Sequence, residues 1–245
     1  MSSAFLRMNL APILLGAVAL AFIAFALPPY LTLDTAKSRI PPPPGVPAYF
    51  PLLVAHVVFA SVAMATAIVQ IVPAIRSRFP ASHRRSGRLY VWLGVLPAGL
   101  TGLVIGVLTP FGPVLRASNV LLALLWLTCT FAGFRMARAG RYADHRRWML
   151  RSVTLTLSII TNRVWAVIFT LALVPQLDTT FAGNESLMVQ TVAGLSGWLG
   201  WVLPLLAVEW WLIDGGRRQL TPRLPRRRAR NSRSRALPAS SIALS

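Results

Sequence analysis

Six stretches of this chain are each long and apolar enough to cross a lipid bilayer as a helix. A spanning helix needs roughly 20 mainly apolar residues, because about 30 Å of hydrocarbon must be crossed at about 1.5 Å per residue. The stretches run approximately from Leu10 to Leu27, Phe50 to Ile75, Leu89 to Leu108, Ala117 to Phe134, Trp148 to Val174 and Met188 to Ile213. Only 13% of the 245 residues are charged, too few to give a water-soluble protein its polar surface. The sequence therefore predicts an all-α fold, a polytopic membrane bundle of six transmembrane helices.

Arginines are concentrated in two of the connections and in the C-terminal tail, while the other connections hold few cations. The two connections contain Arg76, Arg78, Arg84, Arg85 and Arg88 after the second stretch, and Arg135, Arg138, Arg141, Arg146 and Arg147 after the fourth. Positively charged loops remain on the cytoplasmic side during insertion. We therefore expect an N-in/C-in protein of the inner (plasma) membrane, with both termini in the cytoplasm.

The predicted spans divide the chain into three parts. Residues 1–47 hold the first transmembrane helix and an external proline-rich loop, residues 48–213 form a five-helix membrane core, and residues 214–245 are expected to be a disordered basic cytoplasmic tail. Gly215 and Gly216 are expected to end the last helix. An alternative for the first stretch is a cleaved signal peptide, because Arg7 precedes an apolar run that ends in small residues.

The net charge of +19 indicates a partner of opposite charge. A tail tethered at a membrane meets anionic lipid first, and each arginine near that surface contributes about 1 kcal/mol. We therefore expect the basic loops and tail to contact anionic lipids of the bilayer, and we expect no nucleic acid partner. The sequence does not predict the oligomeric state.

Three prolines and several small residues fall within the apolar stretches. Pro73, Pro97 and Pro204 should bend or interrupt their helices. Gly102 and Gly106 in the third span, and Gly200 in the sixth, allow a neighbouring helix to approach closely. These small residues do not distinguish packing within the chain from dimerisation.

A histidine followed by two arginines occurs just before the third span and again just before the fifth. We call His83–Arg85 and His145–Arg147 the HRR motifs; they are 62 residues apart, close to the length of one helical hairpin. With Gly87, Tyr90 and the arginine of the fifth span, they give the region from about Ala48 to Trp211 a resemblance to a family of predicted bacterial membrane proteins, domain of unknown function 2306. The resemblance implies a membrane fold of several spans and no particular activity.

The HRR motifs allow three interpretations. In the simplest, the arginines extend to lipid phosphates and fix the depth of the helices. In the second, His83 and His145 meet in one cytoplasmic pocket and ligate a single haem or a metal, while the arginines hold carboxylates or phosphates. In the third, the arginines bind an anionic head group or a small anionic metabolite without a metal. Three histidines are too few for two haems that each have two histidine ligands, and His56 is a poor partner for His83 because it lies at the external end of the second span.

The fifth span carries a polar face and a charge. Thr154, Ser158 and Asn162 are four residues apart, and Arg151 extends their face toward the cytoplasm. Arg163 lies about midway along the span, where a charged side chain costs about 2.5–3.5 kcal/mol, so we expect it to face the bundle interior and to have a partner. The alternatives are an internal hydrogen-bonding hub and a role with substrate, proton or cofactor.

The most favoured interpretation is an integral membrane protein of unknown activity with a basic cytoplasmic pocket for a small anionic ligand or lipid head group. The alternatives are a single-haem redox protein and a small-solute or proton-coupled transporter. No catalytic residue and no metal site is predicted, and whether the protein is an enzyme stays open. The candidate ligand-binding residues are His56, His83, Arg84, Arg85, Arg88, Tyr90, His145, Arg146, Arg147, Arg151, Asn162 and Arg163.

Overall fold

The structure, a computed structural model, describes the backbone of residues 3–220 and the side chains of residue 10 and residues 12–214. Throughout residues 3–220 the regular structure is helical. The α-helices are α1 (Ser3–Ala26), α2 (Pro28–Leu31), α3 (Tyr49–Ile71), α4 (Pro73–Arg78), α5 (Pro80–Leu89), α6 (Leu96–Val107), α7 (Gly112–Arg138), α8 (Tyr142–Leu173) and α9 (Glu185–Leu220). Two short 3₁₀ turns (Thr35–Lys37, Val174–Gln176) and a π-helical segment, η2 (Tyr90–Val95), complete the elements.

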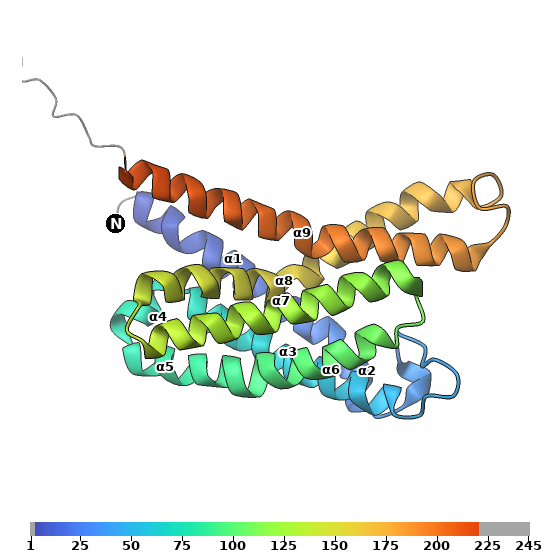
Figure 1. The fold of residues 1–245 in the computed structure, drawn as a ribbon, viewed down its shortest axis with the longest axis horizontal. Coiled ribbons are helices and arrows are strands. Elements are labelled where there is room, and N and C mark those ends of the chain that lie inside the picture. The colour runs from blue at the N-terminus through green and yellow to red at the C-terminus, as the bar shows by residue number, and fades with distance from the viewer. Residues whose placement is uncertain (1–2, 221–245) are drawn as a thin grey trace, which may run out of the picture.

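Six of the helical segments are long and apolar enough to cross a membrane, as the sequence predicts. They are Pro12–Leu31, Tyr49–Ile71, Pro80–Val107, Gly112–Arg138, Tyr142–Gln176 and Glu185–Asp214. The long helices run side by side, and the start of α1 and the end of α9 lie at the same end of the bundle as α4 and α5 (Figure 1). We call this end the basic end, because both HRR motifs lie there.

Two expected boundaries differ from the structure. Each HRR motif was expected in a connection, but His83 and His145 are the fourth residues of α5 and α8, so both motifs lie in the first turns of helices. The last helix was expected to end at Gly215 and Gly216, whereas α9 continues to Leu220. The predicted disordered tail otherwise lies outside the described residues.

The three prolines act differently. Pro73 ends α3, because Val72 before it is extended (ψ 113°) and a new helix, α4, begins at the proline. Before Pro97 the backbone widens into the π-helical segment η2, and the amide of Leu96 bonds the carbonyl of Val91, five residues back. A proline cannot donate to the carbonyl four residues back, and one added residue in the turn accommodates that loss. Pro204 does not interrupt its helix, since α9 continues through it.

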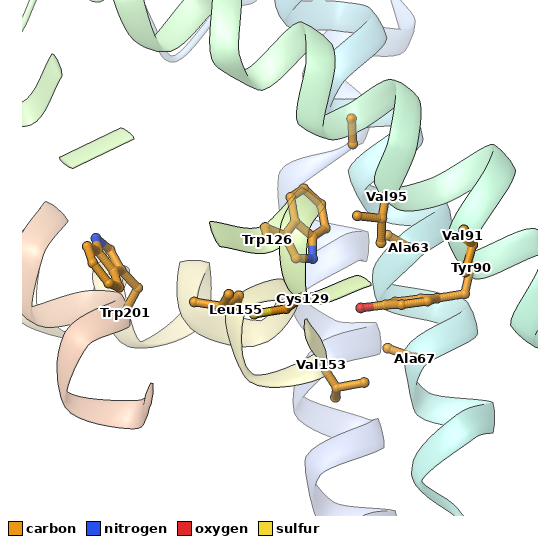
Figure 2. Close-up of a cluster of buried hydrophobic side chains, with 11 residues drawn as sticks. Ala63, Ala67, Tyr90, Val91, Val95, Trp126, Cys129, Val153, Leu155 and Trp201 are labelled. Atoms are coloured by element: carbon orange, nitrogen blue, oxygen red, sulfur yellow. The ribbon is translucent and has the colours of Figure 1, made fainter. Parts of the chain in front are cut away.

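Close packing by small residues and aromatic side chains holds the helices together. A Cβ atom added at Gly94 of η2 would lie 2.8 Å from the Cα of Ala63 in α3, and one at Gly200 of α9 would lie 2.8 Å from the Cα of Asn162 in α8. The main buried cluster draws on α3, η2, α6, α7, α8 and α9, and Figure 2 shows Tyr90, Trp126 and Trp201 entering it from three of these elements. The small residues therefore serve contacts within the chain.

Candidate functional site

The two HRR motifs occupy equivalent places in the structure. α5 begins at Pro80 and α8 at Tyr142, a difference of 142 − 80 = 62 residues, which is also the spacing of His83 and His145. The backbone amide of each histidine bonds the carbonyl of the residue four before it. His83 lies within electrostatic reach of His145, so the fold brings the two imidazoles to one region of the basic end, as the pocket hypothesis expects.

A third pair of residues with the same spacing is in direct contact. The Tyr90 hydroxyl lies 2.6 Å from the Ser152 hydroxyl, and 152 − 90 = 62. α5 and α8 start at the same end of the bundle and run in the same direction (Figure 1). The shared spacing and the Tyr90–Ser152 contact between η2 and α8 are consistent with two parallel hairpins, α3 to α6 and α7 to α8, related by an approximate two-fold axis along the bundle.

The side chains of the two histidines have different surroundings. His145 Nδ1 bonds the carbonyl oxygen of Gly133 in α7 at 2.8 Å. His83 Nδ1 is buried, and among the described residues it has no hydrogen-bond partner. Instead, the Gln70 amide of α3 donates to the His83 carbonyl oxygen (2.9 Å) and to the Ser86 hydroxyl (2.6 Å). A buried imidazole nitrogen without a partner costs free energy and indicates a place where an external group can bind.

The arginines of the HRR motifs are exposed, whereas the histidines are half-buried. Arg76 and Arg84 lie within electrostatic reach of His83. Asp144 pairs with Arg141 (2.6 Å) and more distantly with Arg147 (3.9 Å). Within the described residues no carboxylate pairs with Arg84, Arg85, Arg88 or Arg146, so this end carries uncompensated positive charge.

Tyr90 does not reach the exposed arginines, although it was grouped with them as a candidate. Its side chain is 0% exposed and points to the bundle interior, where its hydroxyl meets Ser152 and the Thr156 hydroxyl (2.7 Å) (Figure 2). Thr156 also accepts from the Trp126 indole (2.9 Å), and Ser152 meets the Thr130 hydroxyl (2.5 Å). This network joins η2, α7 and α8, so Tyr90 holds the site's helices together rather than lining its entrance.

Arg151 is likewise engaged within the bundle. Its guanidinium binds the Glu209 carboxylate of α9 through two hydrogen bonds, the second at 2.8 Å, and lies 4.8 Å from the centre of the Trp148 ring. The pair stabilises the α8–α9 contact at the level of the basic end, and Glu209 neutralises the charge of Arg151 itself.

The polar face of α8 packs on α9, as expected of a face that does not contact lipid. Thr161 donates to the Gly200 carbonyl (2.6 Å), and Asn162 lies against Gly200. The expectation for Arg163 is wrong: its side chain is exposed, and no hydrogen bond or ion pair joins it to any residue that the structure describes. The charged or titratable groups nearest to it are Tyr30 and Arg39. Arg163 follows His145 by 163 − 145 = 18 residues in the same helix, so it lies about 27 Å along α8 from the second HRR motif.

His56 is part of the packing. Its Nδ1 lies 2.9 Å from the Ala98 carbonyl oxygen of α6, and its ring fills the space beside Gly102. The structure thus brings His83, Arg76, Arg84 and His145 together at the basic end and separates Asn162, Arg163 and His56 from them. In the described part of the chain, no three residues among histidine, cysteine, aspartate and glutamate are grouped to hold a metal.

The two half-buried histidines provide at most two ligands to a haem iron. A hollow of about 390 Å³ exists nearby, but it lies on the outer face of α5 and η2 and is lined by Arg85, Arg88, Leu89, Trp92 and Leu93, without either histidine. Imidazole and guanidinium nitrogens are donors that can bind an oxyanion through hydrogen bonds.

Six helices long and apolar enough to cross a membrane, joined in the interior by hydrogen bonds between side chains, define a polytopic helical membrane protein. The family model described as "Predicted membrane protein (DUF2306)" matches residues 53–213, which is most of the chain, and the protein belongs to this family. No match is found among curated proteins or among solved structures.

Sequence analysis did not identify the partners that organise this region. Gln70, Thr130, Ser152 and Thr156 were not among the candidates, because hydroxyls and amides within apolar stretches are common and have no motif. One signal was present: Ser152 follows its HRR motif at the same distance as Tyr90 follows the other.

Proposed function

We propose that this protein binds a small oxyanion at the cytoplasmic end of the bundle, between the first turns of α5 and α8. The ligand is a phosphate or carboxylate group, carried either by a water-soluble metabolite or by an anionic lipid head group. The arginine-rich connections support assigning this end to the cytoplasm, with both termini on the cytoplasmic side of the inner membrane.

The observation that carries the proposal is the unpartnered Nδ1 of His83 beside His145 and two arginines. An oxyanion accepts a hydrogen bond from that nitrogen and charge-assisted bonds from Arg84 and Arg76. It also compensates a set of like charges that otherwise repel one another.

The backbone at the start of α5 and α8 also favours binding of an anion. Both α5 and α8 begin at this end, and neither Phe79 nor Arg141, the residues that precede them, caps its helix with a side-chain hydrogen bond. The free amides and the dipole of a helix N-terminus favour negative charge. Two uncapped helix starts beside exposed arginines therefore suit an anion and disfavour a cation.

Calorimetric titration of the full-length protein in neutral phosphatidylcholine nanodiscs tests the proposal with inorganic phosphate and pyrophosphate as probes. His83→Gln should weaken binding by about tenfold or more, the contribution of one hydrogen bond to a charged group. His83→Asn should restore part of the affinity, because an asparagine amide is as many bonds from the backbone as Nδ1. Equal affinity in His83→Gln and the native protein would overturn the proposal.

A second arm distinguishes the source of the anion. The variant Arg84→Gln is compared with the control variant Arg78→Gln. Arg78 is an exposed arginine of α4, so its replacement removes the same charge outside the proposed site. Binding of phosphate and pyrophosphate would identify a water-soluble ligand. If only phosphatidic acid in the nanodisc raises the thermal stability of the protein, and Arg84→Gln removes this effect, the ligand is a lipid head group.

The single-haem alternative stays a prediction, favoured only by the proximity of His83 and His145. Protein produced with ample haem and purified should then show a haem absorption band that His83→Gln removes. Colourless protein would exclude this alternative.

A further inference from the structure

The outer face of α5 and η2 carries a hollow that the two histidines do not share. Its lining residues, Arg85, Arg88, Leu89, Trp92 and Leu93, follow the spacing of one helix face. Arg85 is the last residue of the first HRR motif, and Arg88 is three residues after it. We call this surface the α5 groove. Its side chains are open: Leu89 is 48%, Trp92 51% and Leu93 47% exposed.

The internal two-fold relation shows what covers the corresponding face of α8. Leu93 corresponds to Leu155, which is only 3% exposed and belongs to the buried cluster that includes Trp201 of α9 (Figure 2). Leu89 corresponds to Arg151, which Glu209 of α9 neutralises. In the second hairpin, α9 therefore supplies both an apolar cover and a negative charge.

The α5 groove has neither. No described helix lies over Leu93, and no described carboxylate pairs with Arg85 or Arg88. By comparison with the covered face, the missing partner combines one negative group at the depth of the arginines with an apolar portion along Trp92 and Leu93.

Size and charge select among possible partners. A hollow of about 390 Å³ is in the range of small-molecule sites and is shallow for a helix about 10 Å wide. A second copy docked through the same face would bring Arg85 and Arg88 against their own equivalents, which repel. A phospholipid carries a phosphate at the head-group level and chains below it, which matches the order of arginines and apolar side chains along the groove.

We infer that the α5 groove is a binding site for an anionic phospholipid of the leaflet at the basic end. Its phosphate binds Arg85 and Arg88, and one acyl chain lies along Leu89, Trp92 and Leu93. Trp92 forms one wall, because its ring packs edge-to-face on Phe134 of α7 at 5.5 Å. This site is separate from the proposed oxyanion site, which uses His83 and Arg84.

Fluorescence quenching by brominated lipids tests the inference on the full-length protein. Nanodiscs of phosphatidylcholine contain a minor fraction of brominated phosphatidylglycerol or, in parallel, of brominated phosphatidylcholine. The chain has eight tryptophans, so the signal of Trp92 is taken as the difference between the native protein and Trp92→Phe. Phenylalanine keeps the apolar wall and an edge-to-face contact with Phe134.

We expect brominated phosphatidylglycerol to quench Trp92 more strongly than brominated phosphatidylcholine does. In Arg85→Gln/Arg88→Gln this preference should fall by about 25-fold, since each arginine near an anionic group contributes about fivefold. The control Arg135→Gln/Arg138→Gln removes two exposed arginines of α7 outside the groove and should keep the preference.

Three outcomes would overturn the inference. Equal quenching by both lipids would show ordinary boundary lipid, and equal loss in both double variants would show a general charge effect. No quenching of Trp92 by either lipid would show that protein covers the groove. Because His83 and Arg84 are unchanged throughout, these results do not depend on the oxyanion site.

Discussion

Removing one oxygen atom, in Tyr90→Phe, should destabilise the bundle measurably. The Tyr90 hydroxyl is fully buried and makes two interhelical contacts, 2.6 Å to Ser152 and 2.7 Å to Thr156. Interhelical hydrogen bonds in membrane proteins contribute about 0.6 kcal/mol on average and about 1.7 kcal/mol at most. Two such bonds give an upper limit of about 3 kcal/mol.

The expected loss is smaller than that limit because the remaining hydroxyls keep other partners. Ser152 retains Thr130, and Thr156 retains the Trp126 indole. We therefore expect Tyr90→Phe to lower the free energy of unfolding by about 1–2 kcal/mol. Adding Ser152→Ala should cost less in the Tyr90→Phe background than in the native protein, with a coupling of about 0.5–1 kcal/mol.

Reversible unfolding in mixed micelles, with increasing mole fraction of dodecyl sulfate and circular dichroism as the signal, measures both quantities. Tyr142→Phe is the matched control, since Tyr142 is 72% exposed at the start of α8 and loses the same oxygen. A Tyr90→Phe protein as stable as the native one, or equal destabilisation by Tyr142→Phe, would refute the assignment of the network as the link between the two hairpins.

Three further predictions concern packing, charge and topology. Gly200→Ala should cost about 1–3 kcal/mol in the same assay, because its Cβ would lie 2.7 Å from that of Asn162, whereas Gly87→Ala, with its nearest neighbour atom at 3.4 Å, should be nearly neutral. Glu209→Gln should destabilise by about 1–3 kcal/mol by leaving Arg151 unpaired in a half-buried site, and replacing both by glutamine should cost less than the sum of the single changes. Reporters fused to the two ends of the chain should both be active only on the cytoplasmic face, and reporters on opposite faces would contradict the N-in/C-in proposal.

The fold could be predicted from the sequence because the bilayer imposes a simple length rule. All six spans were found, since each is long and predominantly apolar. The boundaries at the basic end were less predictable. The first turns of α5 and α8 are rich in arginine and score as loop by hydropathy, yet Pro80 starts a helix there and hydrogen bonding continues through both HRR motifs.

The candidate site was only partly predictable. Which charged side chains meet depends on how deep each one lies in the bundle and on how each helix is rotated about its own axis. Arg163 was expected inside and Arg151 was expected to extend a polar face; instead, Arg151 pairs with Glu209 and Arg163 is exposed. Helix spacing identifies residues on one face, but it does not say which neighbouring helix that face contacts. The proximity of His83 and His145 followed from their equivalent positions, which sequence alone does provide.

The differences between the two hairpins argue that the first one is built to hold something outside the chain. In the second hairpin, α7 continues past Gly133, whose carbonyl receives His145, and α9 covers α8 and neutralises Arg151. In the first, Pro73 ends α3 at the corresponding level, so His83 lacks that carbonyl.

No described helix covers the α5 groove either. A buried imidazole without a partner costs free energy, and the second hairpin avoids this cost because His145 bonds the Gly133 carbonyl. In the proposals above, an oxyanion satisfies His83 and a lipid phosphate neutralises Arg85 and Arg88. The departure from internal symmetry thus places both proposed sites in the same half of the bundle.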